Sequence, residues 1–123
     1  MGSVLWVAAG GALGAVGRYG ISLLPWKSPF PLLTLVTNFL GALVIGFLSG
    51  LLSAKVLGTR GGLFWKTGVC GGFTTFSTFS LETVQLLEKG DYLMGGAYAV
   101  LSVILCLAGV VLGQFFAKVA VRA

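Results

Sequence analysis

Four long apolar stretches, separated by short polar segments, run along this chain. Charged side chains are absent from residues 1–17, 28–54, 67–81 and 92–117. A helix that crosses the hydrocarbon core of a bilayer needs about 20 apolar residues. The pattern therefore predicts an all-α integral membrane protein with four transmembrane helices in a single membrane domain, residues 1–123. We expect these helices at residues 4–24, 33–54, 64–87 and 93–117.

Composition strengthens this prediction and narrows the chemistry. The chain is 57% hydrophobic and 9% charged, whereas soluble domains carry about 25% charged residues. It has no histidine, and its two cysteines, Cys70 and Cys106, both fall within predicted helices. Metal, redox and acid–base chemistry therefore lack most of their usual reagents. We expect no enzymatic activity, no organic cofactor and no nucleic acid partner, and a chain surrounded by membrane lipid.

The distribution of basic residues favours one orientation in the membrane. With four spans both termini share a side, and five basic residues are predicted there: Lys55, Arg60, Lys66, Lys118 and Arg122. The opposite side has three: Arg18, Lys27 and Lys89. The excess mildly favours cytoplasmic termini in a multi-pass protein of the cell inner (plasma) membrane.

The small size of the chain points to an oligomer. Four helices enclose a core just large enough for their own side chains, so a path for a polar solute would run between subunits or along a groove. Glycines four residues apart, such as Gly10 and Gly14 or Gly109 and Gly113, allow helices to approach closely within or between chains. A four-helix chain could gain internal symmetry only by dimerising, in a parallel or an antiparallel arrangement.

Several polar residues in the predicted spans need an explanation. Asn38 would either form a hydrogen bond between helices or aim its amide NH₂ at a passing anion. Tyr98 and Ser102 begin a stripe at steps of four that continues to Cys106, and it is either a polar track or a set of packing contacts. Arg18 would either snorkel to the interface or line an aqueous vestibule that attracts anions.

The segment from Gly71 to Ser80 combines a glycine pair, hydroxyl side chains and two phenylalanines. Gly71–Gly72 and Thr74–Thr75 disfavour a helix, which predicts a break near residues 71–75. A break frees backbone carbonyls, which suit a hard cation such as Na⁺. Phe76 and Phe79 are three residues apart, and their electropositive ring edges could contact an anion; the alternative is a packing stripe.

At this point the residues resemble a known family. "GVCGGFTTFSTFSLE" (Gly68–Glu82) is similar to the signature of the Fluc (CrcB) fluoride channels, with Gly-Gly at 71–72 and Thr-Phe-Ser-Thr-Phe-Ser at 75–80. "TNFLGALVIGF" (Thr37–Phe47) resembles the Asn-bearing second helix of that family. "GGALGAVGRY" (Gly10–Tyr19) resembles its Gly-rich first helix, so the likeness extends over the whole chain.

The resemblance implies a dual-topology antiparallel homodimer with two pores that conduct fluoride passively, exclude chloride and relieve fluoride toxicity. It implies an anion pathway formed by Asn38, Thr75, Phe76, Ser77, Thr78, Phe79, Tyr98 and Ser102, with Arg18 in the vestibule. It also implies a structural Na⁺ at the dimer interface, held by the backbone carbonyls of Gly71 and Thr74. The sequence departs from the pattern at Cys106 and Val110, where hydroxyls are frequent, so the length of the helix-4 track stays open.

Two other functions compete with this one. A small four-helix multidrug or cation exporter would match the size, but it needs an acidic residue centrally in the first helix, where this chain has only Arg18. A non-transporting membrane assembly protein would explain the glycines but not the combination of Asn38, phenylalanines and threonines. Glu82, the one carboxylate well inside a predicted span, is weak evidence for proton coupling.

Overall fold

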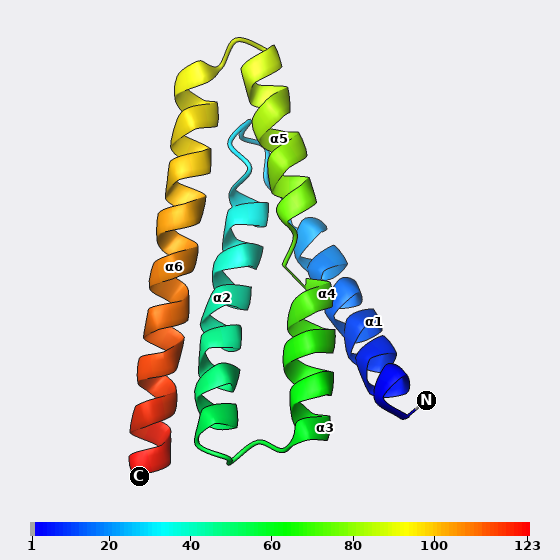
Figure 1. Ribbon diagram of the computed structural model, residues 1–123. Helices are drawn as coiled ribbons and strands as arrows, with labels where there is room; N and C mark the ends of the chain where they lie inside the picture. The colour runs from blue at the N-terminus through cyan, green and yellow to red at the C-terminus, as the bar shows by residue number, and fades with distance from the viewer. Residues whose placement is uncertain (1) are drawn as a thin grey trace.

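The computed structural model describes residues 2–123, and these residues form helices joined by short loops, with no strand among them (Figure 1). Three helices are long: α1 (Gly2–Ser22), α2 (Leu32–Ser53) and α6 (Tyr92–Arg122). The remaining predicted span is a series of shorter elements: α3 (Thr59–Gly61), the π-helix η1 (Gly62–Cys70), α4 (Gly71–Phe73) and α5 (Phe76–Glu88). The all-helical prediction is confirmed.

Three of these helices, α1, α2 and α6, are each long and apolar enough to cross a membrane. The fourth predicted span, residues 64–87, is not a single continuous helix. It runs through η1, α4 and α5 and is interrupted before Phe76. Both termini lie at the same end of the molecule as the loop that joins α2 to α3 (Figure 1), which fits an even number of crossings.

The interruption falls at Thr74 and Thr75, within the predicted range of 71–75. Both residues have extended backbone, with φ/ψ of −119°/117° at Thr74 and −125°/112° at Thr75. The glycines before them are helical, so they are not the break itself. A Cβ on Gly72 would collide with the backbone of Gly11 in α1, so Gly72 serves close packing between helices.

Glycines form the contact between α2 and α6, which lie side by side (Figure 1). A Cβ at Gly113 would stand 2.8 Å from the amide nitrogen of Phe47, and one at Gly46 would reach the backbone of Val110. The two backbones are therefore too close for any side chain at these positions, as expected where small residues drive helix contact in lipid. The predicted close approach of glycine-bearing helices occurs here within one chain.

Close backbone contact through glycine also joins α1 to η1 and α4. A Cβ at Gly10 would lie 2.9 Å from the Cα of Gly68, and one at Gly14 would meet the backbone of Val69. Glycine contacts thus hold together two groups of helices: α2 with α6, and α1 with η1 and α4. Their packing places the extended segment at Thr74–Thr75 beside the middle of α2.

Candidate functional site

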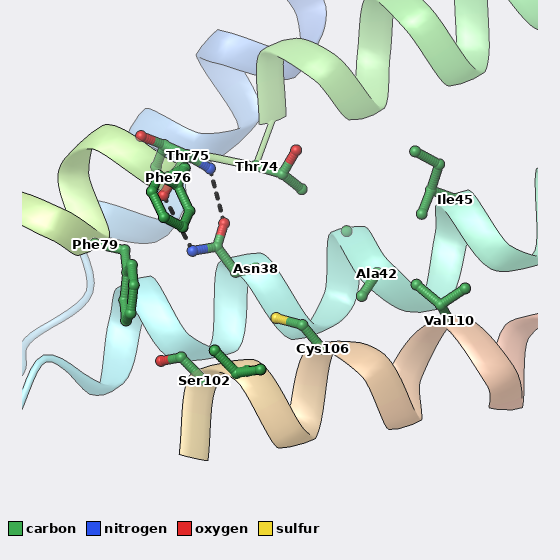
Figure 2. Close-up of a pocket in the computed structure, with 12 residues that line it drawn as sticks. Asn38, Ala42, Ile45, Thr74, Thr75, Phe76, Phe79, Ser102, Cys106 and Val110 are labelled. Carbon is green, nitrogen blue, oxygen red and sulfur yellow. Dashed lines mark hydrogen bonds between the residues drawn. The ribbon is translucent and has the colours of Figure 1, made fainter. Parts of the chain in front are cut away.

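A pocket of about 360 Å³ lies where the interrupted helix faces α2 and α6 (Figure 2). It brings together side chains from three parts of the chain. Its walls are formed by α2 residues Asn38, Gly41, Ala42 and Ile45, by Thr74, Thr75, Phe76 and Phe79 around the interruption, and by α6 residues Ser102, Val103, Cys106 and Val110. No charged side chain belongs to this lining.

The Asn38 side chain on α2 stabilises the interruption by hydrogen-bonding to its backbone. Its Oδ1 accepts a hydrogen bond from the backbone N–H of Thr75 at 2.8 Å, and its Nδ2 donates to the carbonyl of Thr75 at 3.2 Å (Figure 2). The two bonds replace those that Thr75 would make inside a helix, as a backbone group at membrane depth requires. Of the two readings of Asn38, the hydrogen bond between helices is present, and the amide retains a second N–H.

Thr75 is also the N-cap of α5. Its Oγ1 accepts from the backbone N–H of Thr78 at 3.1 Å and contacts the Thr78 hydroxyl at 3.0 Å. The side chain thereby satisfies one of the first-turn amides, as capping threonines do. The N-terminus of α5 lies at the pocket, and its partial positive charge favours an anion there.

A row of aromatic rings leads away from this helix start. The ring centroids of Phe76 and Phe79 are 5.5 Å apart, and those of Phe79 and Tyr98 are 5.2 Å apart, both in tilted arrangements. Tyr98 is completely buried, whereas the side chain of Phe76 is 78% exposed. Phe76 therefore projects from the chain toward lipid or another molecule.

Ser102 carries the one buried side-chain polar atom without a hydrogen-bond partner among residues 2–123. The residue is 5% exposed and lines the pocket opposite Asn38. Leaving a buried hydroxyl unpaired costs about 1–3 kcal/mol, so native structures rarely retain one unless something else binds it. The Ser102 hydroxyl therefore has hydrogen-bonding capacity that no protein group among residues 2–123 uses.

The Tyr98 hydroxyl does not face an open path, because Glu82 accepts its hydrogen bond. Glu82 Oε1 accepts from Tyr98 at 2.9 Å, and Glu82 Oε2 accepts from the hydroxyl of Thr34 at 3.0 Å. An anion that reaches Tyr98 must compete with this carboxylate. Glu82 also borders a second, more polar pocket of about 250 Å³ that is lined by loop residues Trp26 and Ser28–Pro31 together with Gln85 and Lys89.

Arg18 lies on the far side of the interruption from the pocket. Its Nε donates to the carbonyl of Gly72 at 3.4 Å, which places a cation at the carbonyl end of α4. The side chain borders a small cavity of about 80 Å³ with hydroxyl residues Ser22, Thr34, Thr37, Thr75 and Thr78. Arg18 thus points inward, although its role in a vestibule stays a prediction.

Of the two predicted carbonyl ligands, Gly71 lies in α4 and Thr74 lies in the interruption itself. The N–H four residues after Gly71 belongs to Thr75 and is bonded to Asn38, so it does not close a helical bond to the Gly71 carbonyl. Thr74 lies outside both helices, and its hydroxyl donates back to the Cys70 carbonyl at 2.8 Å. Gly71 is exposed and borders none of the three pockets.

The structure gathers some predicted site residues and separates others. Asn38, Thr75, Phe76, Phe79 and Ser102 share the 360 Å³ pocket. Other predicted residues lie elsewhere: Thr78 and Arg18 border the 80 Å³ cavity, Tyr98 binds Glu82, and Ser77 is exposed with its hydroxyl 3.4 Å from that of Thr75.

Two residues at or near the pocket, Glu82 and Gly41, were not among the predicted site residues. Glu82 accepts the hydrogen bond of Tyr98 at the buried end of the aromatic row, whereas the sequence suggested for it only a weak link to proton coupling. Gly41 forms part of the pocket wall because a Cβ there would collide with the methyl of Thr74. Its spacing three residues after Asn38 was the available signal, since both lie on one face of α2.

Comparisons with known proteins agree on one family. Residues 5–114 match the family model described as CrcB-like protein, Camphor Resistance (CrcB). The chain is 45% identical over 119 residues to the fluoride-specific ion channel FluC of Helicobacter pylori strain 26695, covering 93% of this chain and 92% of that protein. It is 48% identical over 120 residues to FluC of Ruminiclostridium cellulolyticum strain H10, covering 94% of this chain and 92% of that protein.

Proposed function

We propose a function from one premise, namely that this chain belongs to the CrcB-like protein family. It is a multi-pass membrane protein, and we infer that it is a fluoride-specific ion channel, as its relatives are named, rather than an enzyme. The observation that carries this proposal beyond the names is the unpaired, buried Ser102 hydroxyl in a pocket that lies at the N-terminus of α5.

The chemistry of the pocket suits an anion that binds weakly and is conducted onward. Moving a bare anion into a low-dielectric interior costs on the order of tens of kcal/mol before compensation. The free N–H of Asn38, the Ser102 hydroxyl and the ring edges of Phe76 and Phe79 can replace part of the lost hydration. Because none of these groups carries a full positive charge, binding stays weak enough for the anion to leave.

Transport needs no energy coupling in this proposal. A membrane potential that is negative inside drives an anion outward with ~2.3 kcal/mol per 100 mV. The channel would therefore export fluoride from the cytoplasm and limit its toxicity. The multidrug exporter is disfavoured because α1 carries Arg18 and no carboxylate.

We further propose that the working unit is an antiparallel homodimer with two pores. The single chain does not enclose the pocket, and Phe76 in its wall is 78% exposed. A second copy that covers this face would close the pocket and shield the ring. Each chain would then contribute one wall to each pore.

A structural Na⁺ belongs to the same proposal. The carbonyls of Gly71 and Thr74 are oxygen donors released from helical bonding at the interruption, and unwound helices offer such donors to Na⁺. Two carbonyls are fewer than a hard cation takes, so a second copy would have to supply the others. Coordination distances at these two oxygens in a crystal of the dimer test this directly; a site with water geometry would refute it.

Efflux from liposomes tests the function. Vesicles loaded with potassium fluoride and containing the protein should release fluoride when a potassium ionophore removes the charge imbalance, as an ion-selective electrode records. Vesicles loaded with potassium chloride should keep their chloride. Fluoride retained with active ionophore would reject the function, and Phe79→Ile and Asn38→Ala that match the wild type in both rate and selectivity would reject the pore assignment.

A further inference from the structure

The pocket contains a nucleophilic side chain that the proposed pathway does not use. Cys106 lies one helical turn after Ser102 on α6, so both side chains share a face of that helix and both line the pocket. The Cys106 thiol is free and half-buried, and its sulfur points toward the side of the pocket where Asn38 lies (Figure 2).

The second cysteine occupies a different environment. Cys70 is free but only 2% exposed, and it borders none of the three pockets. A reagent small enough to enter the pocket would therefore meet one of the two thiols and not the other. The chain thus provides its own matched control.

The neighbourhood of Cys106 suits a soft cation that arrives as a neutral complex. Thiol sulfur is the soft donor that thiophilic metals select over oxygen. The pocket wall is mostly apolar, so a neutral dihalide of mercury(II) enters without the desolvation cost of a bare ion. The Ser102 side chain lies one turn away on the same wall, and its buried hydroxyl has no partner among residues 2–123.

From this arrangement we propose that Cys106 is a binding site for thiophilic cations of the mercury(II) class, and that a metal bound there closes the anion pocket. In the reaction, the S–H bond and one Hg–Cl bond break, and an S–Hg bond forms. The proton and one chloride leave to water, and nothing is oxidised or reduced. The sulfur keeps a bulky –HgCl group that fills space between Asn38 and Ser102.

The binding part of the proposal stands on the pocket alone, whereas the blocking part rests on the proposed fluoride conduction. The experiment separates them with two measurements on the full chain in liposomes. Intact mass after exposure to mercuric chloride reports attachment, and fluoride efflux before and after exposure reports block. The experiment uses three proteins: the wild type, Cys106→Ser and Cys70→Ser. For each, the fluoride efflux rate after exposure is compared with the rate of the same protein before exposure.

The wild type and Cys70→Ser should each gain one mercury at Cys106 and lose nearly all efflux, and an added dithiol should restore it. Cys106→Ser should gain no mercury in the pocket and keep its efflux. Attachment to Cys70 in place of Cys106, or equal block of Cys106→Ser, would overturn the site. Attachment to Cys106 without slower efflux would overturn its place in the path. A wild type without efflux before exposure would instead reject the proposed function, and mass would still decide binding.

Discussion

At the scale of single residues, hydrogen-bond donors at the pocket differ in whether they have partners. Asn38 uses both ends of its amide on Thr75, whereas the Ser102 hydroxyl is buried and unpaired. The first arrangement stabilises the fold and the second costs free energy. Substitution of Asn38 should therefore lower the free energy of unfolding, whereas substitution of Ser102 should not.

Ser102→Ala should separate function from stability. It removes an unpaired buried hydroxyl, so the free energy of unfolding should stay the same or rise by about 1 kcal/mol, while fluoride efflux should fall. Thr37→Ala is the control, because its buried hydroxyl donates to the Leu33 carbonyl at 2.8 Å and its loss should lower the melting temperature. Thermal unfolding in detergent and liposome efflux measure the two effects; a clear loss of stability in Ser102→Ala would contradict the assignment.

Asn38 can be tested with two substitutions that keep different parts of the amide. Asn38→Ala removes both bonds to Thr75 and leaves its N–H unpaired, which should cost about 1–3 kcal/mol of stability. Asn38→Asp keeps an acceptor for that N–H but adds a negative charge to an anion pocket. We expect a smaller loss of stability for Asp than for Ala and little efflux from either. An Asp variant that conducts like the wild type would exclude Asn38 from the pathway.

The sequence was informative about residue types at the site and less so about their partners. The interruption, the phenylalanine pair and Ser102 follow from local spacing, since each depends on neighbours within two helical turns. The bond of Asn38 to Thr75 and that of Tyr98 to Glu82 join separate helices. Such pairs depend on how the helices pack, and a single sequence does not encode that packing in any periodic pattern.

At the scale of elements, α2 and α6 behave as one unit because their backbones touch through glycine. The contacts at Gly46 and Gly113 leave no room for a Cβ. Helices in lipid gain little hydrophobic stabilisation from meeting, so this packing supplies much of their attraction. The 3.6-residue period showed which residues share a face, but whether those faces meet inside one chain or between two was left open until the structure placed them.

Gly113→Leu should separate α2 from α6. Its side chain would run into the Leu43 carbonyl and the Phe47 amide, and overpacking of this kind costs about 1–3 kcal/mol or more. Gly96→Leu on the same helix is the matched control, since a Cβ there meets nothing within 4 Å. The melting temperature in detergent should drop for the first and stay near the wild type for the second. Equal melting temperatures would contradict the contact.

At the scale of the whole molecule, the two ends differ in charge, and the longest helix exceeds the thickness of the hydrocarbon core. The end with the termini and the α2–α3 loop carries Lys55, Arg60, Lys66, Lys118 and Arg122, whereas the other carries Lys27 and Lys89 with Glu88 and Asp91. α6 has 31 residues, which span about 46 Å at 1.5 Å per residue. This exceeds the roughly 30 Å hydrocarbon core, so part of α6 extends beyond it.

Labelling of one engineered cysteine tests whether the chain inserts in both orientations. In a background with Cys70→Ser and Cys106→Ser, Ser28→Cys places a thiol in the exposed loop between α1 and α2. A membrane-impermeant maleimide applied to whole cells should label about half of the chains if insertion is dual, and nearly all of them if the excess of basic residues holds the termini in the cytoplasm. A second variant with cysteine at Ala123 should give the complementary half. Complete labelling of one variant and none of the other would reject the antiparallel dimer.

The bond between Asn38 and Thr75 also has a consequence for biosynthesis. Synthesis proceeds from the N-terminus, so α2 and its Asn38 leave the ribosome before residues 74–75 do. The acceptor for the Thr75 amide is therefore already in the bilayer when the extended segment arrives. The Asn38 side chain can therefore pair with the Thr75 backbone as soon as residues 62–88 enter the bilayer. In a circularly permuted chain that is synthesised with α2 last, residues 74–75 would enter the bilayer before Asn38. Their backbone groups would then lack hydrogen-bond partners, and more of the protein should be degraded.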